Sequence, residues 1–302
     1  MVRCWSAHKN ELVMKLVSER HVKVSDDPLV ELFVAQTSGP ADRTLLVVHG
    51  GPVWDHTYLL EPLLGLGGER RVVFADLRGC GRSTRGLPGP AHTPAAAVND
   101  LSVLIDELGG PVDVLGFSYG GMLVQRLLVT APTKVRRAVI ASSSILPVTS
   151  DAYAGYAERD ARLARLTPTP EPDGPWDDDR LRRDAVTSAA LNIWRLDLLP
   201  HYLDVVNQVQ FSADWANAWP DRSHMPPARP HQVVEELRDL DVPLLLLHGR
   251  QDMTFPAALV QRTTELIPAA RGTVLENAGH MAHIDQPDAW LDAVSRFLSA
   301  AP

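Results

Sequence analysis

Ser118 lies at the centre of the run Gly116-Phe117-Ser118-Tyr119-Gly120, between an apolar segment and an amphipathic one. A serine at the junction of a strand and a helix occupies a strained turn, and small flanking residues let neighbouring backbone pass close to it. We therefore predict that Ser118 is a nucleophile. The alternative interpretation is a glycine-rich helix start with an exposed serine.

A serine hydroxyl attacks at neutral pH only when a base takes its proton and a third group orients that base. Asp252, in His248-Gly249-Arg250-Gln251-Asp252, follows one late apolar run, and His280, in Asn277-Ala278-Gly279-His280, follows the next. The chain order of serine, acid and histidine fits a nucleophile of this kind. We predict that His280 is the base and that Asp252 orients it.

Other residues could compete for these roles. His283 is an alternative base, although its position predicts the start of the last helix. His49 and His248 precede glycines at strand ends and are expected to be hydrogen-bonded within the loops. Asp285 and Asp288 are expected in the first turn of the closing helix, where an acid offsets the helix dipole.

Acyl transfer also needs donors for a developing oxyanion, one of which is the backbone N–H that follows the nucleophile. That donor is Tyr119. The loop His49-Gly50-Gly51-Pro52 is expected to supply the second, and Gly51 is favoured because Pro52 has no N–H. A plain tight turn is the alternative interpretation of this loop.

The elements that must position these residues can be predicted from hydrophobic periodicity. Two strand-like runs, 19–25 and 29–36, are separated by a turn at Asp26-Asp27-Pro28 and predict a hairpin. Continuous apolar runs then alternate with helical patterns, which indicates a mostly parallel α/β sheet covered on both faces. The expected strands are 45–48, 72–74, 112–115, 138–141, 243–248 and 272–275, and the expected helices lie within 94–108, 122–128 and 290–297 and after Pro256.

Strand patterns stop between residues 146 and 240, where acidic, Pro-rich and helical segments carry four of the seven tryptophans. The same alternation flanks this stretch on both sides. We therefore predict one core domain, 1–145 and 241–302, with a helical cap, 146–240, inserted after the sixth strand. The run Asp177-Asp178-Asp179 is expected to be a solvated helix start.

Composition narrows the possible partners. The chain of 302 residues is 45% hydrophobic and carries a formal charge of -8, with Lys and Arg scattered, so no nucleic-acid partner is expected. No uninterrupted apolar run could serve as a leader or a membrane span, which makes the cytoplasm the default location. Cys4 and Cys80 form no disulfide framework or zinc motif, so no metal or organic cofactor is expected. The oligomeric state is left open.

Several motifs occur together in the order seen in α/β-hydrolases, and they resemble the proline iminopeptidase family most. They are His49-Gly50-Gly51-Pro52, residues 76–83, the Ser118 run, residues 248–252 and Gly279-His280. The resemblance spans Arg43 to the C-terminus without the insertion. It implies the α/β-hydrolase fold and a serine peptidase that releases an N-terminal residue.

The resemblance also implies roles for other residues. Asp76, Arg78 and Arg82 are expected to shape a loop, and Cys80 could place a thiol near the pocket. Members of the family bind the substrate amine with acidic cap residues and its ring with aromatic ones. The candidates are Glu158, Asp160, Asp204 and Asp214 for the amine, and Trp54, Trp194, Tyr202, Phe211 and Trp215 for the ring.

At two positions this sequence differs from the family, which weakens the inference that it shares the family's substrate. Tyr119 replaces the usual tryptophan, and Val53 replaces the glycine that usually follows the loop proline. We expect an amide hydrolase that removes an N-terminal aminoacyl group from a small molecule or short peptide through an acyl-enzyme. An esterase, lactonase or thioesterase with the same triad is the alternative, and a non-catalytic ligand-binding protein is a distant one.

Overall fold

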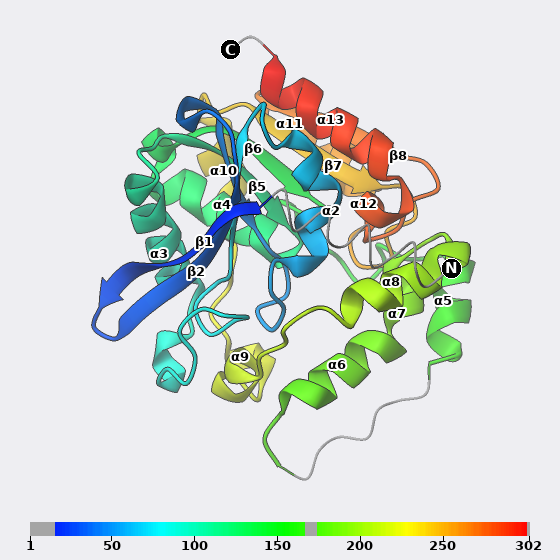
Figure 1. Cartoon of the computed structure of the whole chain (residues 1–302). Coiled ribbons are helices and arrows are strands. Elements are labelled where there is room, and N and C mark those ends of the chain that lie inside the picture. Colours follow the sequence, from blue (N-terminus) through cyan, green and yellow to red (C-terminus); the bar gives the residue numbers. More distant parts are fainter. Residues whose placement is uncertain (1–15, 167–173, 301–302) are drawn as a thin grey trace.

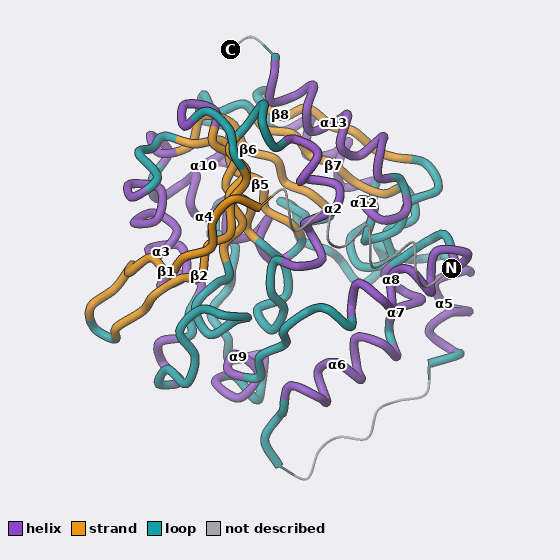
Figure 2. Tube along the Cα trace, in the orientation of Figure 1, coloured by secondary structure: helices purple, strands orange, loops and turns teal. Residues whose placement is uncertain are grey.

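The computed structural model describes residues 16–166 and 174–300, and its centre is an eight-stranded sheet with the order β1-β2-β4-β3-β5-β6-β7-β8. Strands β1 and β2 form an antiparallel hairpin, β2 is antiparallel to β4, and the remaining neighbours are parallel. Figure 2 shows the strands running between two groups of helices. The strands are β1 (Leu16–Asp26), β2 (Leu29–Thr37), β3 (Thr44–Val48), β4 (Arg71–Ala75), β5 (Val112–Phe117), β6 (Val135–Ala141), β7 (Leu244–Gly249) and β8 (Ala270–Leu275).

Helices cover both faces of the sheet (Figure 1). Those of the core are α2 (Leu60–Leu63), α3 (Pro94–Glu107), α4 (Tyr119–Thr130), α11 (Ala258–Leu266), α12 (Ala282–Asp285) and α13 (Pro287–Ser299). Helices α3, α4 and α11 contribute to one hydrophobic cluster, and α2, α12 and α13 contribute to the other. The predicted sheet with two covered faces is confirmed.

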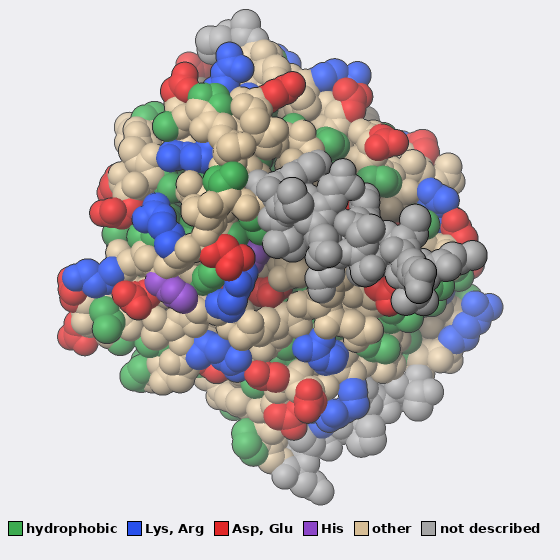
Figure 3. Space-filling model, viewed as in Figure 1, with side chains coloured by type: hydrophobic (Ala, Val, Ile, Leu, Met, Phe, Trp, Pro, Cys, Tyr) green, Lys and Arg blue, Asp and Glu red, His purple; other side chains and the backbone are tan. Residues whose placement is uncertain are grey.

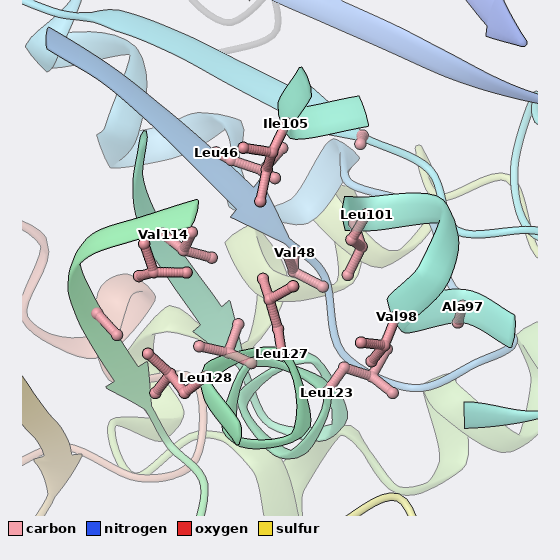
Figure 4. Packing of buried hydrophobic residues seen from close by; sticks show 14 of the residues in the cluster. Leu46, Val48, Ala97, Val98, Leu101, Ile105, Val114, Leu123, Leu127 and Leu128 are labelled. Atoms are coloured by element: carbon pink, nitrogen blue, oxygen red, sulfur yellow. The ribbon is translucent and has the colours of Figure 1, made fainter. Parts of the chain in front are cut away.

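The apolar run of β3 explains why both faces are buried. Side chains alternate between the faces of a strand, so Leu46 and Val48 join the first cluster while Leu45 and Val47 join the second. All four are fully buried. Figure 4 shows how residues of β3, β5, α3 and α4 meet in the first cluster, among them Leu46, Val114, Leu101, Leu123 and Leu127.

Helix α3 shows how local sequence sets an element. Thr93 has extended backbone angles, and its side chain accepts the N–H of Ala96, which caps the helix. Pro94 occupies the first helical position, where its missing N–H costs nothing. Gly109, just beyond the end of the helix, has φ +83° and lets the chain turn into β5.

The segment between β6 and β7 contains helices, as predicted for the cap, and they are α5 (Ala157–Ala164), α6 (Asp178–Thr187), α7 (Ala189–Asn192), α8 (Leu199–Val206), α9 (Asp214–Ala218) and α10 (Val233–Arg238). Helix α6 begins at the acidic run, where Asp177 accepts the N–H of Arg180. Helix α10 packs against α4, and its Val233 and Leu237 belong to the first core cluster. The last cap helix therefore extends the core, and α6 to α9 also contribute buried residues to the two clusters, among them Leu181, Tyr202 and Trp215.

Charges of both signs are interspersed on the face shown in Figure 3. Within the described ranges, no helix is both long and apolar enough to span a bilayer.

Candidate active site

Ser118 occupies the turn between β5 and α4 and has φ +52° and ψ -116°. A residue other than glycine rarely adopts this positive φ, which costs about 1–2 kcal/mol. The turn is held because the Ser118 N–H donates to the carbonyl of Ala141, at the end of β6, over 2.9 Å. The predicted junction of strand, serine and helix is present, with the serine at the helix N-terminus.

Gly120 allows the turn to sit against the neighbouring strand. A Cβ at this position would lie 2.2 Å from the carbonyl oxygen of Val48 and 2.5 Å from that of His49. Any side chain would therefore separate α4 from the end of β3. The glycine of the motif brings the Ser118 turn next to the loop that contains Gly51.

The structure brings Ser118, His280 and Asp252 together from the ends of β5, β8 and β7. The Oγ of Ser118 lies 3.2 Å from Nε2 of His280, and Nδ1 of His280 lies 3.0 Å from Oδ2 of Asp252. Because a carboxylate only accepts, the hydrogen of the neutral ring is at Nδ1, and Nε2 offers its lone pair to the serine hydroxyl. In this arrangement, Nε2 of His280 can accept the proton of the Ser118 hydroxyl.

Asp252 is fully buried, and its second oxygen is also occupied. Oδ1 accepts the backbone N–H groups of Thr254 and Phe255 at 2.7 and 2.9 Å. Burial acts to raise the pKa of this carboxyl, but the attraction of His280 and the hydrogen bonds of His248 and His280 outweigh it, so the pKa lies below its ordinary value. Asp252 is therefore a carboxylate at neutral pH.

The loop around His280 is fixed from several sides. The N–H of Met281 donates to the carbonyl of Asn192 in the cap over 2.7 Å. The His280 ring has edge-on contact with Phe117 and tilted contact with Phe255, with ring centroids 5.4 and 5.9 Å away. The imidazole therefore has little freedom to leave Ser118.

The loop after β3 is also held in place. The Gly50 N–H donates to the Tyr58 hydroxyl over 2.7 Å, and the His49 ring bonds the Gly50 carbonyl through Nδ1 and accepts the Leu77 N–H through Nε2. Gly50 is therefore unavailable to a substrate. Gly51, with φ +53°, remains the donor expected from this loop.

A cavity of about 370 Å³ opens beside Ser118, because Gly51 and Tyr119 are both part of its wall. Its other walls come from the loop after β3 and from the cap. They are Pro52, Val53, Trp54, Trp176, Leu181, Asp184, Ala185, Ser188, Trp215, Ala216, Trp219 and Met225. The lining is mostly apolar and aromatic, with a few polar groups, which is typical of a small-molecule site.

Asp184 is the acidic residue in this wall. Its Oδ1 is buried and has no hydrogen-bond partner among the described residues. A buried oxygen of this kind costs about 1–3 kcal/mol when it stays unpaired. Polar groups left in this state in a cavity are candidates for contacts with a ligand.

The sequence-predicted aromatic residues of the substrate site lie in three places. Trp54 and Trp215 line the cavity, and Trp194 lies in a separate depression with Arg195. Tyr202 and Phe211 are buried in the second core cluster, where Phe211 packs edge-on against Trp54.

The four predicted carboxylates lie outside the cavity wall. Glu158 pairs with Arg162 at 2.7 Å, and Asp160 and Asp204 are exposed. Asp214 accepts the Gly86 N–H over 2.6 Å.

Asp184, Trp176 and Trp219 were not among the sequence-predicted residues. A signal for Asp184 exists, because Leu181, Asp184, Ala185 and Ser188 follow the i, i+3, i+4, i+7 spacing of one helical face. A carboxylate on the same face of α6 as the apolar Leu181 and Ala185 breaks the expected pattern and is a candidate for a polar group of a site. The tryptophans have no comparable periodic signal.

His283 and His248, the alternatives to His280, each have a backbone carbonyl as hydrogen-bond partner. His283 is buried, and its Nε2 lies 3.1 Å from the carbonyl of Tyr58. His248 contacts Phe255 and Asp252. Asp285 differs from the expected first-turn acid of the closing helix, because it lies in α12 and accepts backbone N–H groups of Gly279, Trp194 and Arg195.

The residues of the 76–83 loop have scaffold contacts. Asp76 bonds the His56 ring and the Arg82 N–H, and Arg78 forms a two-point pair with Asp100 at 2.5 and 2.6 Å. Cys80 is fully buried, and its Sγ lies 3.3 Å from the carbonyl of Pro52. Cys4 lies outside the described residues. No three His, Cys, Asp or Glu side chains gather as metal ligands in residues 16–166 and 174–300.

Comparisons with known proteins agree with this architecture. A family model described as the alpha/beta hydrolase family matches residues 45–293. A proline iminopeptidase from Levilactobacillus brevis is 28% identical over 273 residues, which cover 85% of this chain and 88% of the relative.

Two solved structures resemble this one over nearly the whole chain. A proline iminopeptidase-related protein from Thermus thermophilus has a TM-score of 0.68 and 26% identity, and the match covers 93% of this chain and 97% of the other. An esterase from Thermogutta terrifontis has a TM-score of 0.69 and 22% identity, and the match covers 93% of this chain and 98% of the esterase. The esterase shows the shared fold alone. The predicted fold, with a helical cap after the sixth strand, is confirmed.

Proposed function

The chain belongs to the alpha/beta hydrolase family, and we propose that it is a serine hydrolase that removes an N-terminal aminoacyl group from a small peptide or peptide-like molecule. The observation that carries the aminoacyl preference is Asp184, the acidic residue that lines the cavity and whose buried Oδ1 has no hydrogen-bond partner among the described residues. The reaction proceeds through an acyl-enzyme on Ser118.

The chemistry follows from the contacts of the three residues. As Ser118 Oγ attacks the substrate carbonyl carbon, its proton passes to Nε2 of His280 across their 3.2 Å contact. The tetrahedral intermediate then collapses, the C–N bond breaks, and the leaving amine takes that proton. A water molecule attacks the ester on Ser118 with His280 as base, which releases the acid and restores the serine.

Asp252 and the backbone stabilise the charges that form. The carboxylate of Asp252 lies 3.0 Å from Nδ1 of His280 and stabilises the imidazolium, which remains bonded to it throughout. The N–H groups of Tyr119 and Gly51 hold the oxyanion. Loss of one such donor costs about 3–4 kcal/mol of transition-state stabilisation.

Asp184 gives the site a preference for a positive charge on the acyl side. A substrate ammonium within hydrogen-bond distance of Oδ1 would supply the missing partner in a wall that is otherwise largely apolar. An uncharged acyl group would leave that oxygen unpaired, which makes its binding less favourable. The tryptophans of the wall leave room for an apolar or ring-shaped side chain beside the amine.

A matched pair of substrates tests this function. Prolyl-naphthylamide carries the free amine, and N-acetyl-prolyl-naphthylamide lacks it while keeping the same scissile bond. We expect the free amine to be hydrolysed faster, and the Ser118→Ala variant to lose the activity. Full activity of that variant would rule out the proposed nucleophile, whereas equal rates on the two substrates would rule out amine recognition.

An esterase or lactonase remains the second candidate, because most of the cavity wall is apolar. Short acyl nitrophenyl esters test it in the same assay. A preference for these esters over the free-amine amide would favour an uncharged acyl group.

A further inference from the structure

His248, at the end of β7, is a buried histidine whose contacts the reaction described above does not use. Its Nε2 lies 2.8 Å from the carbonyl oxygen of Phe255 and 3.2 Å from Oδ2 of Asp252. Both neighbours are acceptors, so a hydrogen must be present at Nε2. This hydrogen is shared between a backbone carbonyl and the carboxylate that also binds His280.

The other ring nitrogen fixes the state of His248. Nδ1 is buried and has no hydrogen-bond partner among the described residues. A hydrogen at Nε2 has two acceptors within reach, whereas a hydrogen at Nδ1 would have none, so the tautomer with its hydrogen at Nε2 is the one that fits these contacts. A ring rotated by half a turn would place a carbon near both acceptors and break both contacts.

The carboxylate of Asp252 therefore has four polar neighbours, two at each oxygen. Oδ1 accepts the backbone N–H groups of Thr254 and Phe255, and Oδ2 accepts the N–H of the His280 ring and lies 3.2 Å from Nε2 of His248. Phe255 takes part twice, because its N–H binds Oδ1 and its carbonyl binds His248. His248 thus connects β7 to the turn at 252–255 through its hydrogen bond to Phe255 and its close contact with Asp252.

We propose that His248 is a positioning residue, whose shared Nε2–H holds Oδ2 of Asp252 toward His280 and reduces the negative charge that this oxygen presents. The proposal rests on the proposed function, because His248 acts only through the triad. The packing of a buried ring would require no N–H, and support of the 252–255 turn alone would require only the Phe255 carbonyl.

Two consequences follow for the reaction. A fixed carboxylate keeps the His280 ring in the orientation that points Nε2 at Ser118. A carboxylate that shares its charge with a second donor also stabilises the imidazolium of residue 280 less than an unshared one would.

Two variants of similar size separate these roles. His248→Gln retains an N–H donor at about the reach of Nε2, whereas His248→Leu removes the donor and keeps an apolar side chain. The measurement is the second-order rate of Ser118 labelling by a fluorophosphonate across pH. This reagent reports the triad without depending on the acyl group that the enzyme prefers.

We expect His248→Leu to lower the labelling rate by roughly 10- to 100-fold, as for a lost hydrogen bond to a charged group. The acid side of its profile of labelling rate against pH should also move to higher pH, because the carboxylate of Asp252 is then no longer shared with a second donor. His248→Gln should restore most of the labelling rate and return the acid side of the pH profile to its wild-type position. If His248 only supports the turn through its contact with Phe255, His248→Leu will lower the labelling rate equally at every pH. The acid side of the pH profile will then stay in place, and this result would overturn the proposal.

The remaining ionisable groups near this turn are the same in both variants, so a difference in the acid side of the pH profile reports residue 248. Those that face the turn or His280 from neighbouring elements are Tyr153, Tyr156, Arg159 and His283. A circular dichroism spectrum confirms that each variant is folded. Should His248→Leu not fold, His248→Asn takes its place, because its amide ends short of Oδ2.

Failure of the two proposals can be told apart. If wild-type protein is not labelled, or Ser118→Ala is labelled as fast as wild type, the serine hydrolase function fails. If wild type is labelled at Ser118 and His248→Leu matches it at every pH, only the role of His248 fails.

Discussion

Asp285 holds Gly279 through a 2.7 Å hydrogen bond from the Gly279 N–H to Oδ2. The same oxygen accepts the N–H of Trp194 at 2.8 Å, and Oδ1 accepts that of Arg195 at 2.9 Å. One side chain of α12 thus joins the residue before His280 to a loop of the cap. The position of the cap and the position of the base are mechanically linked.

Replacement of Asp285 by alanine should therefore affect stability and activity together. Three backbone N–H groups lose their acceptor, and we expect the free energy of unfolding to fall by roughly 2–5 kcal/mol. Urea denaturation measures this loss, and Asp288→Ala, at the start of α13, is the matched control. Equal stabilities of the two variants would contradict the link.

Two substitutions of Ser118 should separate the backbone strain at this position from the catalytic role of its hydroxyl. Both Ser118→Ala and Ser118→Gly remove the hydroxyl and should abolish fluorophosphonate labelling. Only glycine relieves the left-handed φ of +52°, so we expect it to be the more stable variant by about 0.5–1 kcal/mol, after its greater chain entropy is subtracted. Thermal melts of the pair check this order, and a more stable alanine variant would argue against a strained turn.

Asp184→Asn removes the proposed partner of the substrate amine and keeps the shape of the side chain. We expect kcat/KM on free-amine aminoacyl amides to fall roughly 10- to 100-fold. Hydrolysis of a short acyl nitrophenyl ester should stay near the wild-type rate. The control is Asp179→Asn, an exposed position on the same helix, and equal losses on both substrates would mean that Asp184 has no role in amine binding.

Cys80 should resist thiol reagents in the folded protein. Its side chain is fully buried, and burial raises the pKa of the thiol well above its ordinary value, so little thiolate forms. In a Cys4→Ser background, we expect negligible reaction with a disulfide reagent until a denaturant is added. Stoichiometric labelling of the native protein would show that the loop around Cys80 opens.

His283 should make the fold sensitive to acid. Burial lowers the pKa of its imidazole to about 3, although the bond to Tyr58 opposes the shift. The unfolded ring takes up a proton below about pH 6.5, whereas the folded one stays neutral, so stability falls as the pH drops from about 6.5 to about 3. The largest slope from one such group is about 1.4 kcal/mol per pH unit.

A His283→Gln variant isolates this contribution, because glutamine does not titrate. Urea denaturation at a series of pH values between 7 and 4 should give a shallower loss of stability for the variant. Other buried histidines are common to both proteins and cancel in the comparison. Parallel curves would mean that His283 is protonated in the folded state.

The sequence was sufficient for the parts of the structure that depend on short-range patterns. Runs such as 45–48 predicted buried strands because each residue faces one of two covered surfaces. The order of Ser118, Asp252 and His280 predicted a meeting at one edge of the sheet, because parallel strands end there together. The structure places these three side chains in contact.

Side-chain partners across the cap could not be predicted in the same way. Glu158 and Asp214 are acidic residues in the cap, yet their partners, Arg162 and the Gly86 N–H, depend on how each helix is rotated and docked. Asp285 also resembles an ordinary helix-start acid until residues about 90 positions away in the chain meet it. Asp184 faces the cavity because α6 docks with that face inward.

The cap leaves the sheet from β6 and returns to it at β7, and these strands pair directly, from Ala138 with Leu244 to Ala141 with Leu247. Its two attachment points are therefore fixed by the ladder and not by the length or sequence of what lies between them. A chimera that receives the corresponding segment of another hydrolase could keep Ser118, Asp252 and His280 in register. Substrate range in such proteins can then diversify by exchange of one module, provided that the new segment again supplies partners for Asp285.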